Sequence, residues 1–288
     1  MSRVATYLSF VRFSHSVFAL PFALTGALLA LHRGPLPERD VLWRVLWIVV
    51  AMVSARSAAM GFNRLADADY DAKNPRTAAR EIPRGAMSRA EASVFVGVSS
   101  LAFIAASAML GRNCLALSPV ALAIVFWYSL AKRVTNYTQF FLALAMAVAP
   151  VGGWLAAGGR LAAAEPWLLG AAIGSWVGGF DILYACQDLE FDRAAGLKSI
   201  PVRFGVPRSL LLSRLMHVLA VGCLAVLGVL ADLGPSYQVG VALVAVLLVY
   251  EQSLVRADDL SQVKRAFDLN GYVGILYFVA TAVAVYVR

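Results

Sequence analysis

Long apolar runs separated by short polar segments dominate the chain. The runs predict helices near residues 13–31, 42–62, 91–111, 115–131, 138–157, 167–187, 209–231, 237–254 and 270–287. Most approach the length of about 20 apolar residues that one crossing of a bilayer requires. Runs such as 210–231 are apolar on every face, whereas the strands of a membrane β-barrel alternate apolar and polar residues. The pattern therefore predicts an all-α, polytopic membrane bundle of about nine transmembrane helices.

Composition supports this class of protein. The chain of 288 residues is 60% hydrophobic and only 15% charged, whereas soluble domains average about 45–50% apolar and about 25% charged residues. The first run, 13–31, is interpreted as a retained span because no small-residue cleavage site follows a short apolar core. The three cysteines lie far apart in apolar surroundings and show no metal-ligand or disulfide spacing.

The basic residues behind the net charge of +8 are concentrated in alternate loops. With the N-terminus placed in the cytoplasm, eighteen lysines and arginines fall on the cytoplasmic side and six on the opposite side, while Arg56 lies inside the second run. This asymmetry is the pattern that orients membrane proteins, and it argues against a nucleic-acid partner. We therefore expect an integral multi-pass protein of the cell (inner) membrane, in contact with the lipid bilayer, whose long loops 63–90 and 188–208 are cytoplasmic.

Acidic residues gather in two clusters at the ends of apolar runs. Seven of the 17 acidic residues lie in the segments 63–71 (NRLADADYD) and 181–192 (DILYACQDLEFD). Asp67 and Asp71, and likewise Asp188 and Asp192, are four residues apart and so share one helix face. Their mutual repulsion near a membrane favours a cation between them, and a divalent ion with oxygen ligands such as Mg²⁺ is the simplest candidate.

The two clusters also resemble each other in their surroundings. Tyr184, Asp188 and Asp192 take the places of Asn63, Asp67 and Asp71, and a basic loop with an Ile-Pro pair follows each cluster, at 82–83 and 200–201. We interpret this as a degenerate internal repeat within a single domain, 1–288, whose halves run roughly 1–137 and 138–288. Such symmetry predicts that both clusters meet at the mouth of one cavity.

Two pairs of carboxylates suit the ionisation of a prenyl diphosphate. Magnesium held by one or two carboxylates leaves coordination positions for substrate phosphates, and basic neighbours would neutralise the remaining charge. The allylic cation left behind needs a dry pocket with aromatic faces. The candidate basic residues are Arg64, Lys73, Arg80, Lys198 and Arg203, and the candidate rings are Phe126, Trp127, Tyr128, Phe180 and Tyr184.

These segments resemble the UbiA superfamily of intramembrane aromatic prenyltransferases. Its signature NxxxDxxxD is matched at 63–71, and its signature DxxYxxxDxxxD is matched at 181–192. Arg56-Ser57, the segment 76–85 and the segment 196–201 match as well. The chain looks most similar to 4-hydroxybenzoate polyprenyltransferases and their relatives in menaquinone routes. The resemblance implies a nine-helix bundle with a central cavity open laterally to lipid. It also implies Mg²⁺-dependent transfer of a polyprenyl group to an aromatic ring carbon, without an obligate protein partner.

The residues and the resemblance together assign candidate roles. The metal ligands would be Asp67, Asp71, Asp188 and Asp192, and the catalytic set would be Asp67, Asp181, Tyr184 and Asp188. The diphosphate would be bound by Asn63, Arg64, Lys73, Arg80, Lys132, Arg133 and Lys198, and the aromatic acid by Arg56. Many family members carry an arginine where this chain has Ala68, and Arg64, one turn earlier, is the proposed substitute.

Plainer structural roles stay open for several of these residues. The aspartates would also suit solvated helix ends, Asn63 an N-cap, and Lys132 with Arg133 the basic anchor of a cytoplasmic helix end. Asp181, deep in its span, would suit a salt bridge with Arg56 as well as a place near the reacting carbons.

Three other functions compete with this interpretation. An ion-coupled transporter would place its carboxylates at mid-membrane beside broken helices, whereas these lie at cytoplasmic ends beside basic loops. A CDP-alcohol phosphotransferase would carry an Asp-Gly-x-x-Ala-Arg run, which the chain lacks. Within the resembling family, the acceptor could instead be a naphthoate, a porphyrin such as haem, or a chlorophyllide.

Overall fold

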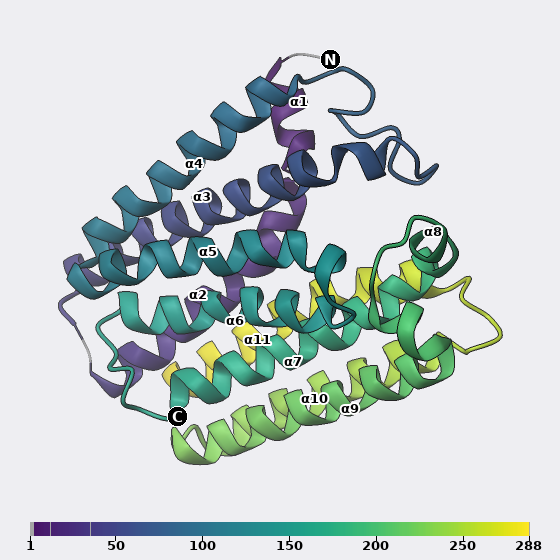
Figure 1. Cartoon of the computed structure of the whole chain (residues 1–288). Coiled ribbons are helices and arrows are strands. Elements are labelled where there is room, and N and C mark those ends of the chain that lie inside the picture. Colours follow the sequence, from purple (N-terminus) through teal and green to yellow (C-terminus); the bar gives the residue numbers. More distant parts are fainter. Residues whose placement is uncertain (1–2, 12, 35, 288) are drawn as a thin grey trace.

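The protein is a bundle of long helices, as the apolar runs predict (Figure 1). The computed structural model describes residues 3–11, 13–34 and 36–287, with the side chains of 3–5, 8 and 13–19 left out. The long helices are α2 (Phe13–Arg33), α3 (Glu38–Asp71), α4 (Arg89–Leu110), α5 (Arg112–Val134), α6 (Thr138–Ala156), α7 (Glu165–Ala185), α9 (Ile200–Leu230), α10 (Gly234–Ser253) and α11 (Val263–Tyr286). Three short elements accompany them: α1 (Arg3–Phe10), the 3-10 turn η1 (Cys186–Asp188) and α8 (Leu189–Ala194).

The helices are long and apolar enough to make this an integral membrane protein. Among the described residues, eight helical segments meet the length and hydropathy of a membrane span, from Glu38–Asp71 to Val263–Tyr286. The 21-residue helix α2 coincides with the predicted first span. Large apolar side chains such as Leu101, Val218 and Val246 lie exposed on the outside of the bundle, where lipid would cover them. The predicted all-α membrane bundle is confirmed.

Two groups of helices share the bundle. The first, α2 to α6, is linked by contacts between α2 and α3, α3 and α4, α4 and α5, α5 and α6, and α2 and α6. The second, α7, α9, α10 and α11, packs on the first through contacts of α7 with α6 and of α11 with α2. Figure 1 shows α3, α4 and α5 on one side and α9 and α10 on the other, with α2, α6, α7 and α11 between them.

The α2–α6 contact depends on two glycines that bring the helix backbones close together. A Cβ on Gly153 would lie 1.9 Å from the carbonyl oxygen of Ala23, and one on Gly26 would lie 2.1 Å from that of Pro150. Neither space holds a methyl group, and small residues of this kind are what allow close helix packing inside membranes. The approach fixes α6 against α2 and so fixes one wall of the interior.

The helices extend beyond the apolar runs at their polar ends. α3 continues from the predicted end at 62 to Asp71, so the first acidic cluster is helical. The predicted loop 188–208 contains the last residue of η1, all of α8 and the first turns of α9, where Ser199 caps the helix and Pro201 occupies its first turn. Gly205, with φ of 73°, breaks α9 before the apolar run begins. α11 likewise begins at Val263 and not at 270. Hydropathy locates the span, but backbone hydrogen bonding carries the helix into the polar region.

The polar segments that follow α3 and α7 lie at the same end of the bundle (Figure 1). The segment 72–88 after α3 is tied down by buried contacts: Glu81 accepts 2.6 Å hydrogen bonds from Arg64 of α3 and from Ser9 of α1. Ser88 then starts α4 with a capping box closed by Glu91. The segment is therefore a fixed cover over the end of α3.

Candidate active site

The first aspartate motif occupies the last two turns of α3. Asp67 and Asp71 are buried, and Asn63 lies one turn before Asp67 with its Nδ2 atom 3.4 Å from Asp67 Oδ2. Because Asn63 is inside a continuous helix, the N-cap alternative is wrong for this residue. Asp69, between the two, is exposed on another face and contacts Arg89.

Basic side chains from two other elements neutralise this motif. Lys132 Nζ, in the last turn of α5, lies 2.6 Å from Asp67 Oδ2, and Arg133 lies 3.5 Å from Asp67 Oδ1. From the 72–88 segment, Arg80 Nη1 reaches both oxygens of Asp71 at 2.8 and 2.7 Å. Contacts of this kind within a low-dielectric site are strong, charge-assisted hydrogen bonds.

The second motif begins on α7 and continues through η1 into α8. Asp181 and Tyr184 belong to α7, Asp188 ends η1, and Asp192 lies in α8. Arg76 clamps Asp188 with two hydrogen bonds, Nε to Oδ1 at 3.0 Å and Nη2 to Oδ2 at 2.6 Å, and its Nη1 atom is 3.2 Å from Tyr184 Oη. Partial burial lowers the pKa of Arg76, but Asp188 outweighs it, so the net pKa is raised and the guanidinium stays charged.

Shared basic residues show that the two motifs face a common space. Arg76, bonded to Asp188, also interacts electrostatically with Asp71 of the first motif. Lys132, bonded to Asp67, interacts electrostatically with Asp192 of the second motif. Residues more than a hundred positions apart in the sequence thus form one group of alternating negative and positive charges at one end of the bundle.

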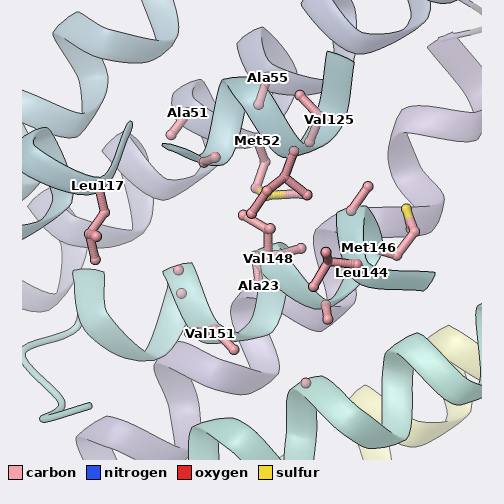
Figure 2. A pocket seen from close by; sticks show the side chains of 18 of the residues that line it. Ala23, Ala51, Met52, Ala55, Leu117, Val125, Leu144, Met146, Val148 and Val151 are labelled. Carbon is pink, nitrogen blue, oxygen red and sulfur yellow. The ribbon is translucent and has the colours of Figure 1, made fainter. Parts of the chain in front are cut away.

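A large apolar cavity lies inside the first helix group, next to this charged cluster. Its volume is about 600 Å³, and its walls come from α2 to α7 with one methionine of α9. Figure 2 shows how small and aliphatic side chains line it, with Ala51, Met52 and Ala55 of α3 opposite Val148 and Val151 of α6. The cavity is therefore dry enough to hold an apolar chain.

Arg56 and Tyr128 are the polar residues that join the cavity to the aspartates. Arg56 is the one arginine or lysine in the described lining, and its Nε atom is buried without a hydrogen-bond partner. Its Nη1 atom lies 3.9 Å from the sulfur of Met146. Tyr128 interacts electrostatically with Arg56, Asp67 and Asp181. Arg56 and Asp181, both described, do not form the alternative salt bridge, since the contact of the Arg56 guanidinium is the Met146 sulfur.

The cavity also reaches the outside of the bundle between α5 and the α6–α7 pair. Leu117 and Val120 of α5, Leu144 of α6 and Trp167 of α7 line the cavity and are themselves 42–55% exposed. A long apolar ligand in the cavity therefore has a path to the lipid-facing surface.

The five candidate aromatic residues lie in different surroundings. Tyr128 alone among them lines the described cavity. Phe126 packs on Phe62 with its ring tilted, Trp127 is 44% exposed beside Phe141, and Phe180 packs in the core against Phe267. Tyr184 contacts Arg76 and Phe267, near Asp188. Most of these rings are ordinary packing residues.

The remaining predicted diphosphate ligands are Arg64, Lys73 and Lys198. Arg64 is buried in an ion pair with Glu81 at 2.6 Å and faces Phe10, which corrects its assignment as the substitute for an arginine at position 68. Arg64 lies one turn before Ala68 on α3, and its partner Glu81 belongs to the 72–88 segment. Lys198 donates to the Val134 carbonyl at the end of α5, 3.0 Å away, and Lys73 is exposed in a turn.

Arg76 is the site residue to which sequence reasoning gave no role. It appeared only as part of a matched segment, although it makes the bidentate contact to Asp188. The available signal was charge balance: the second motif needs a cation, and the basic loop after the first motif is long enough to supply one. The fold of the 72–88 segment decides which of its arginines contacts Asp188.

The oxygen-rich donor set suits a hard divalent cation. In the described part of the chain, no three His, Cys, Asp or Glu side chains lie close enough to share one ion. A metal here would therefore be held by one or two carboxylates and would complete its coordination with oxygens of the substrate. Mg²⁺ is commonly bound in this way at phosphate sites. Asp67, Asp71, Asp188 and Asp192 are the candidate ligands.

Comparison with known proteins places the chain in a family. Residues 19–281 match the UbiA prenyltransferase family. A 4-hydroxybenzoate octaprenyltransferase of Xanthomonas euvesicatoria is 34% identical over 245 residues, covering 85% of this chain and 80% of the relative. Another, from Shewanella sediminis, is 30% identical over 255 residues, covering 88% of this chain and 87% of the relative.

Solved structures agree with the fold. A UbiA homolog from Aeropyrum pernix superposes with a TM-score of 0.85 at 36% identity, covering 94% of this chain and 98% of that one. A UbiA homolog from Archaeoglobus fulgidus, bound to GPP and Mg²⁺, superposes with a TM-score of 0.73 at 19% identity, covering 98% of this chain and all (100%) of that one. With both aspartate motifs in place at one end of the bundle, the chain belongs to the UbiA prenyltransferase family and is a membrane-embedded prenyltransferase.

Proposed function

We propose that the protein catalyses the Mg²⁺-dependent transfer of a polyprenyl group from its diphosphate to an aromatic acid, with 4-hydroxybenzoate as the first candidate acceptor, in quinone biosynthesis. The observation that carries the proposal is the junction of a charged, aspartate-rich rim with a dry cavity that contains an unpaired guanidinium. We further propose that the rim faces the cytoplasm from the inner membrane, because the basic residues concentrate in the loops on that side.

The rim supplies the binding site for the diphosphate. Arg76, Arg80 and Lys132 already surround the carboxylates, with Arg133 beside Asp67, so positive charge lies where a diphosphate bound to the aspartates would lie. We assign these four residues to diphosphate binding, with Asn63 oriented toward Asp67. A bound Mg²⁺ would offset the negative charge that develops on the leaving diphosphate.

The cavity supplies the environment for the prenyl chain and its cation. When the C1–O bond breaks, its electron pair leaves with the diphosphate, and a ring carbon of the acceptor forms the new bond to C1. Apolar walls exclude the water that would otherwise capture the cation, and the Tyr128 ring lies between the cavity and Asp67. The displaced ring proton must be accepted, and Asp181, which interacts with Tyr128, is the proposed acceptor.

Arg56 supplies recognition of the acceptor. A buried guanidinium without a carboxylate partner is costly, and an aromatic carboxylate would satisfy it with a bidentate contact. Its place in the cavity lining, with Tyr128 between it and the aspartates, would direct the ring toward the reacting carbon. The named activity of the relatives, 4-hydroxybenzoate octaprenyltransferase, supports the same acceptor.

The test is a transfer assay with purified protein in lipid. A labelled prenyl diphosphate and Mg²⁺ are offered with 4-hydroxybenzoate, a dihydroxynaphthoate, haem or a chlorophyllide. We expect a prenylated product with 4-hydroxybenzoate and none when EDTA replaces Mg²⁺. Product with a different acceptor alone would retain prenyl transfer but reject the acceptor. Labelled product with no acceptor dependence, or none with any acceptor, would reject the function.

Arg56→Met tests the acceptor site separately. We expect the KM for 4-hydroxybenzoate to rise roughly 10- to 100-fold, since a charge-assisted contact contributes about 1.5–3 kcal/mol, while the KM for prenyl diphosphate stays near the wild-type value. Arg44→Met is the matched control, because Arg44 lies on the same helix and donates to the Ala156 carbonyl instead. An unchanged acceptor KM in Arg56→Met would contradict the assignment.

A further inference from the structure

A buried glutamate lies outside the active site, in the second helix group. Glu251, in the last turn of α10, has no solvent exposure, and neither of its carboxylate oxygens has a hydrogen-bond partner. The apolar residues Leu248 and Val244 precede it on the buried face of α10, and the cluster of Val255, Val263 and Ala266 encloses the same end of the bundle. An ionised carboxylate in such a place would have lost its water without gaining a donor.

The other glutamates of the chain are all satisfied or solvated. Of the six, Glu81 is paired with Arg64, Glu165 with Arg33 and Glu190 with Arg193. Glu91 accepts hydrogen bonds in the capping box of α4, and Glu38 is exposed in the first turn of α3. Glu251 therefore differs from every other glutamate: it is fully buried, no cation pairs with it, and the Asn270 amide is its polar neighbour.

The groups that face Glu251 bring no positive charge. From α11, Asn270 is the polar neighbour, but its amide nitrogen already donates to the carbonyls of Ala266 and Phe267. From α7, Trp176 donates its Nε1–H to Asn270 Oδ1 at 2.6 Å. Arg265 of α11 turns away to the exposed hydroxyl of Tyr250, 3.0 Å distant.

The titratable group from α9 is a neutral histidine. Gln252, next to Glu251, donates to Ser213 Oγ at 2.7 Å and to His217 Nδ1 at 3.1 Å. His217 Nε2 lies 3.3 Å from the Trp176 carbonyl, a geometry that suits a ring with its proton on Nε2. Among the described residues, no cation is paired with either carboxylate oxygen of Glu251.

We propose that Glu251 is a proton-binding site inside the membrane bundle and that it holds its proton at neutral pH. The side chain is then a neutral carboxylic acid packed against Asn270, which in turn contacts Trp176 of α7. A bound proton removes the negative charge of the Glu251 carboxylate and needs neither additional space nor further ligands. A metal ion would need about six oxygen ligands, and Glu251 with Asn270 Oδ1 offers only three. The proposal is independent of the prenyl-transfer function.

The site has a consequence for the active site, because it backs the helix that carries the second motif. Trp176 is held from α11 through Asn270 and from α9 through His217, and it lies five residues before Asp181 on α7. A charge at Glu251 would disturb the packing on this side of α7. The proton thus allows α7, α9, α10 and α11 to close around one another.

Infrared spectroscopy of protein labelled only in its glutamate carboxyl carbons tests the proposal directly. At neutral pH we expect one glutamate signal of the protonated-acid type, which disappears in Glu251→Gln. Glu190→Gln, which changes an exposed glutamate paired with Arg193, is the matched control and should keep the signal.

Each outcome is decisive. A wild-type spectrum with only ionised glutamate at neutral pH would overturn the proposal, and so would a protonated signal that survives Glu251→Gln. If Glu251→Gln does not fold, the five remaining single Glu→Gln variants assign the signal by elimination. All five should retain it, and loss in any one of them would place the proton elsewhere.

Discussion

Charge pairing at single residues explains why aspartates are stable at the edge of a membrane. Asp67 with Lys132, Asp71 with Arg80, and Asp188 with Arg76 each form a short ion pair in which at least one partner is largely buried. Removing one member leaves the other uncompensated, which is costly in a low-dielectric site. In the proposed function these three basic side chains also contact the diphosphate, so each carboxylate and its basic partner contribute together to substrate binding.

Replacing Asp67 or Asp188 by Asn should abolish turnover. Each substitution removes a proposed metal ligand, and we expect kcat for prenyl transfer to fall at least about a hundredfold, the scale on which electrostatic contacts to developing charge act. Helix content and membrane insertion should stay unchanged by circular dichroism and by fractionation.

Asp69→Asn is the matched control, because this aspartate lies on the same helix turn but is exposed and paired with Arg89. It should retain near wild-type activity. Asp67→Asn or Asp188→Asn with activity equal to that of Asp69→Asn would remove the aspartates from the mechanism.

The aspartates were predictable at this scale, whereas several of their partners were not. Spacing of four residues on a helix fixes which side chains share a face, so Asp67 with Asp71 follows from sequence alone. Whether Arg64 or Arg76 reaches the carboxylates depends on helix rotation against α1 and on the course of the 72–88 segment. Those are tertiary features, and they reverse the assignment: Arg64 pairs with Glu81 and Arg76 with Asp188.

At the scale of elements, α7 is the helix on which the site depends. In its apolar 18-residue window, 72% of the residues are buried, whereas the share is 22% in α4 and in α5, which face outward. Contacts with α6 on one side and α9 on the other hold it in the middle of the bundle. A motif on such a helix is positioned by the whole core. Changes in helix packing should therefore displace the second motif more than the first.

Gly153→Ala tests the close packing of α6 on α2. The added methyl would overlap the carbonyl oxygen of Ala23, 1.9 Å away, so we expect the protein to be destabilised by about 2 kcal/mol or more. Gly152→Ala, one residue earlier, is the control, because nothing lies within 4 Å of its added Cβ. It should be neutral or stabilising by up to about 1 kcal/mol. Thermal unfolding in detergent compares the two, and equal melting temperatures would contradict the packing argument.

Apolar runs predicted which helices exist but not where they end. The run 209–231 marks the membrane part of α9, yet the helix starts at Ile200 because Ser199 caps it and Pro201 suits its first turn. α3 carries the first motif on its final turns although those residues are polar. Hydropathy reports contact with lipid, and helix ends in the polar region depend on caps and on tertiary contacts.

At the scale of the whole molecule, one end of the bundle is charged and the interior beside it is apolar. The loops that follow α3 and α7 meet at that end (Figure 1), and the cavity lies between the helices of the first group. The proposed two-fold pseudo-repeat, 1–137 and 138–288, stays a prediction. The cavity of about 600 Å³ is lined by the first half together with α6 and α7, whereas the cavity between α7, α9, α10 and α11 has a volume of about 10 Å³.

Orientation is testable with single cysteines. In a chain whose three native cysteines are replaced, Arg256→Cys and Arg160→Cys place thiols in exposed positions at opposite ends of the bundle. A membrane-impermeant thiol reagent should label Arg160→Cys in intact cells, and Arg256→Cys only in inverted vesicles. The reverse pattern would place the aspartates outside the cell and overturn the cytoplasmic assignment.

Diphosphate-dependent metal binding tests the central claim most directly, namely that both aspartate motifs hold one metal-bound diphosphate. Mn²⁺ in place of Mg²⁺ can be followed by electron paramagnetic resonance, with and without a non-reacting prenyl diphosphate analogue. The account predicts tight Mn²⁺ binding by the wild type and by Asp69→Asn only when the analogue is present, and its loss in both Asp67→Asn and Asp188→Asn. Tight binding that survives in either of those variants, or that ignores the analogue, would contradict it.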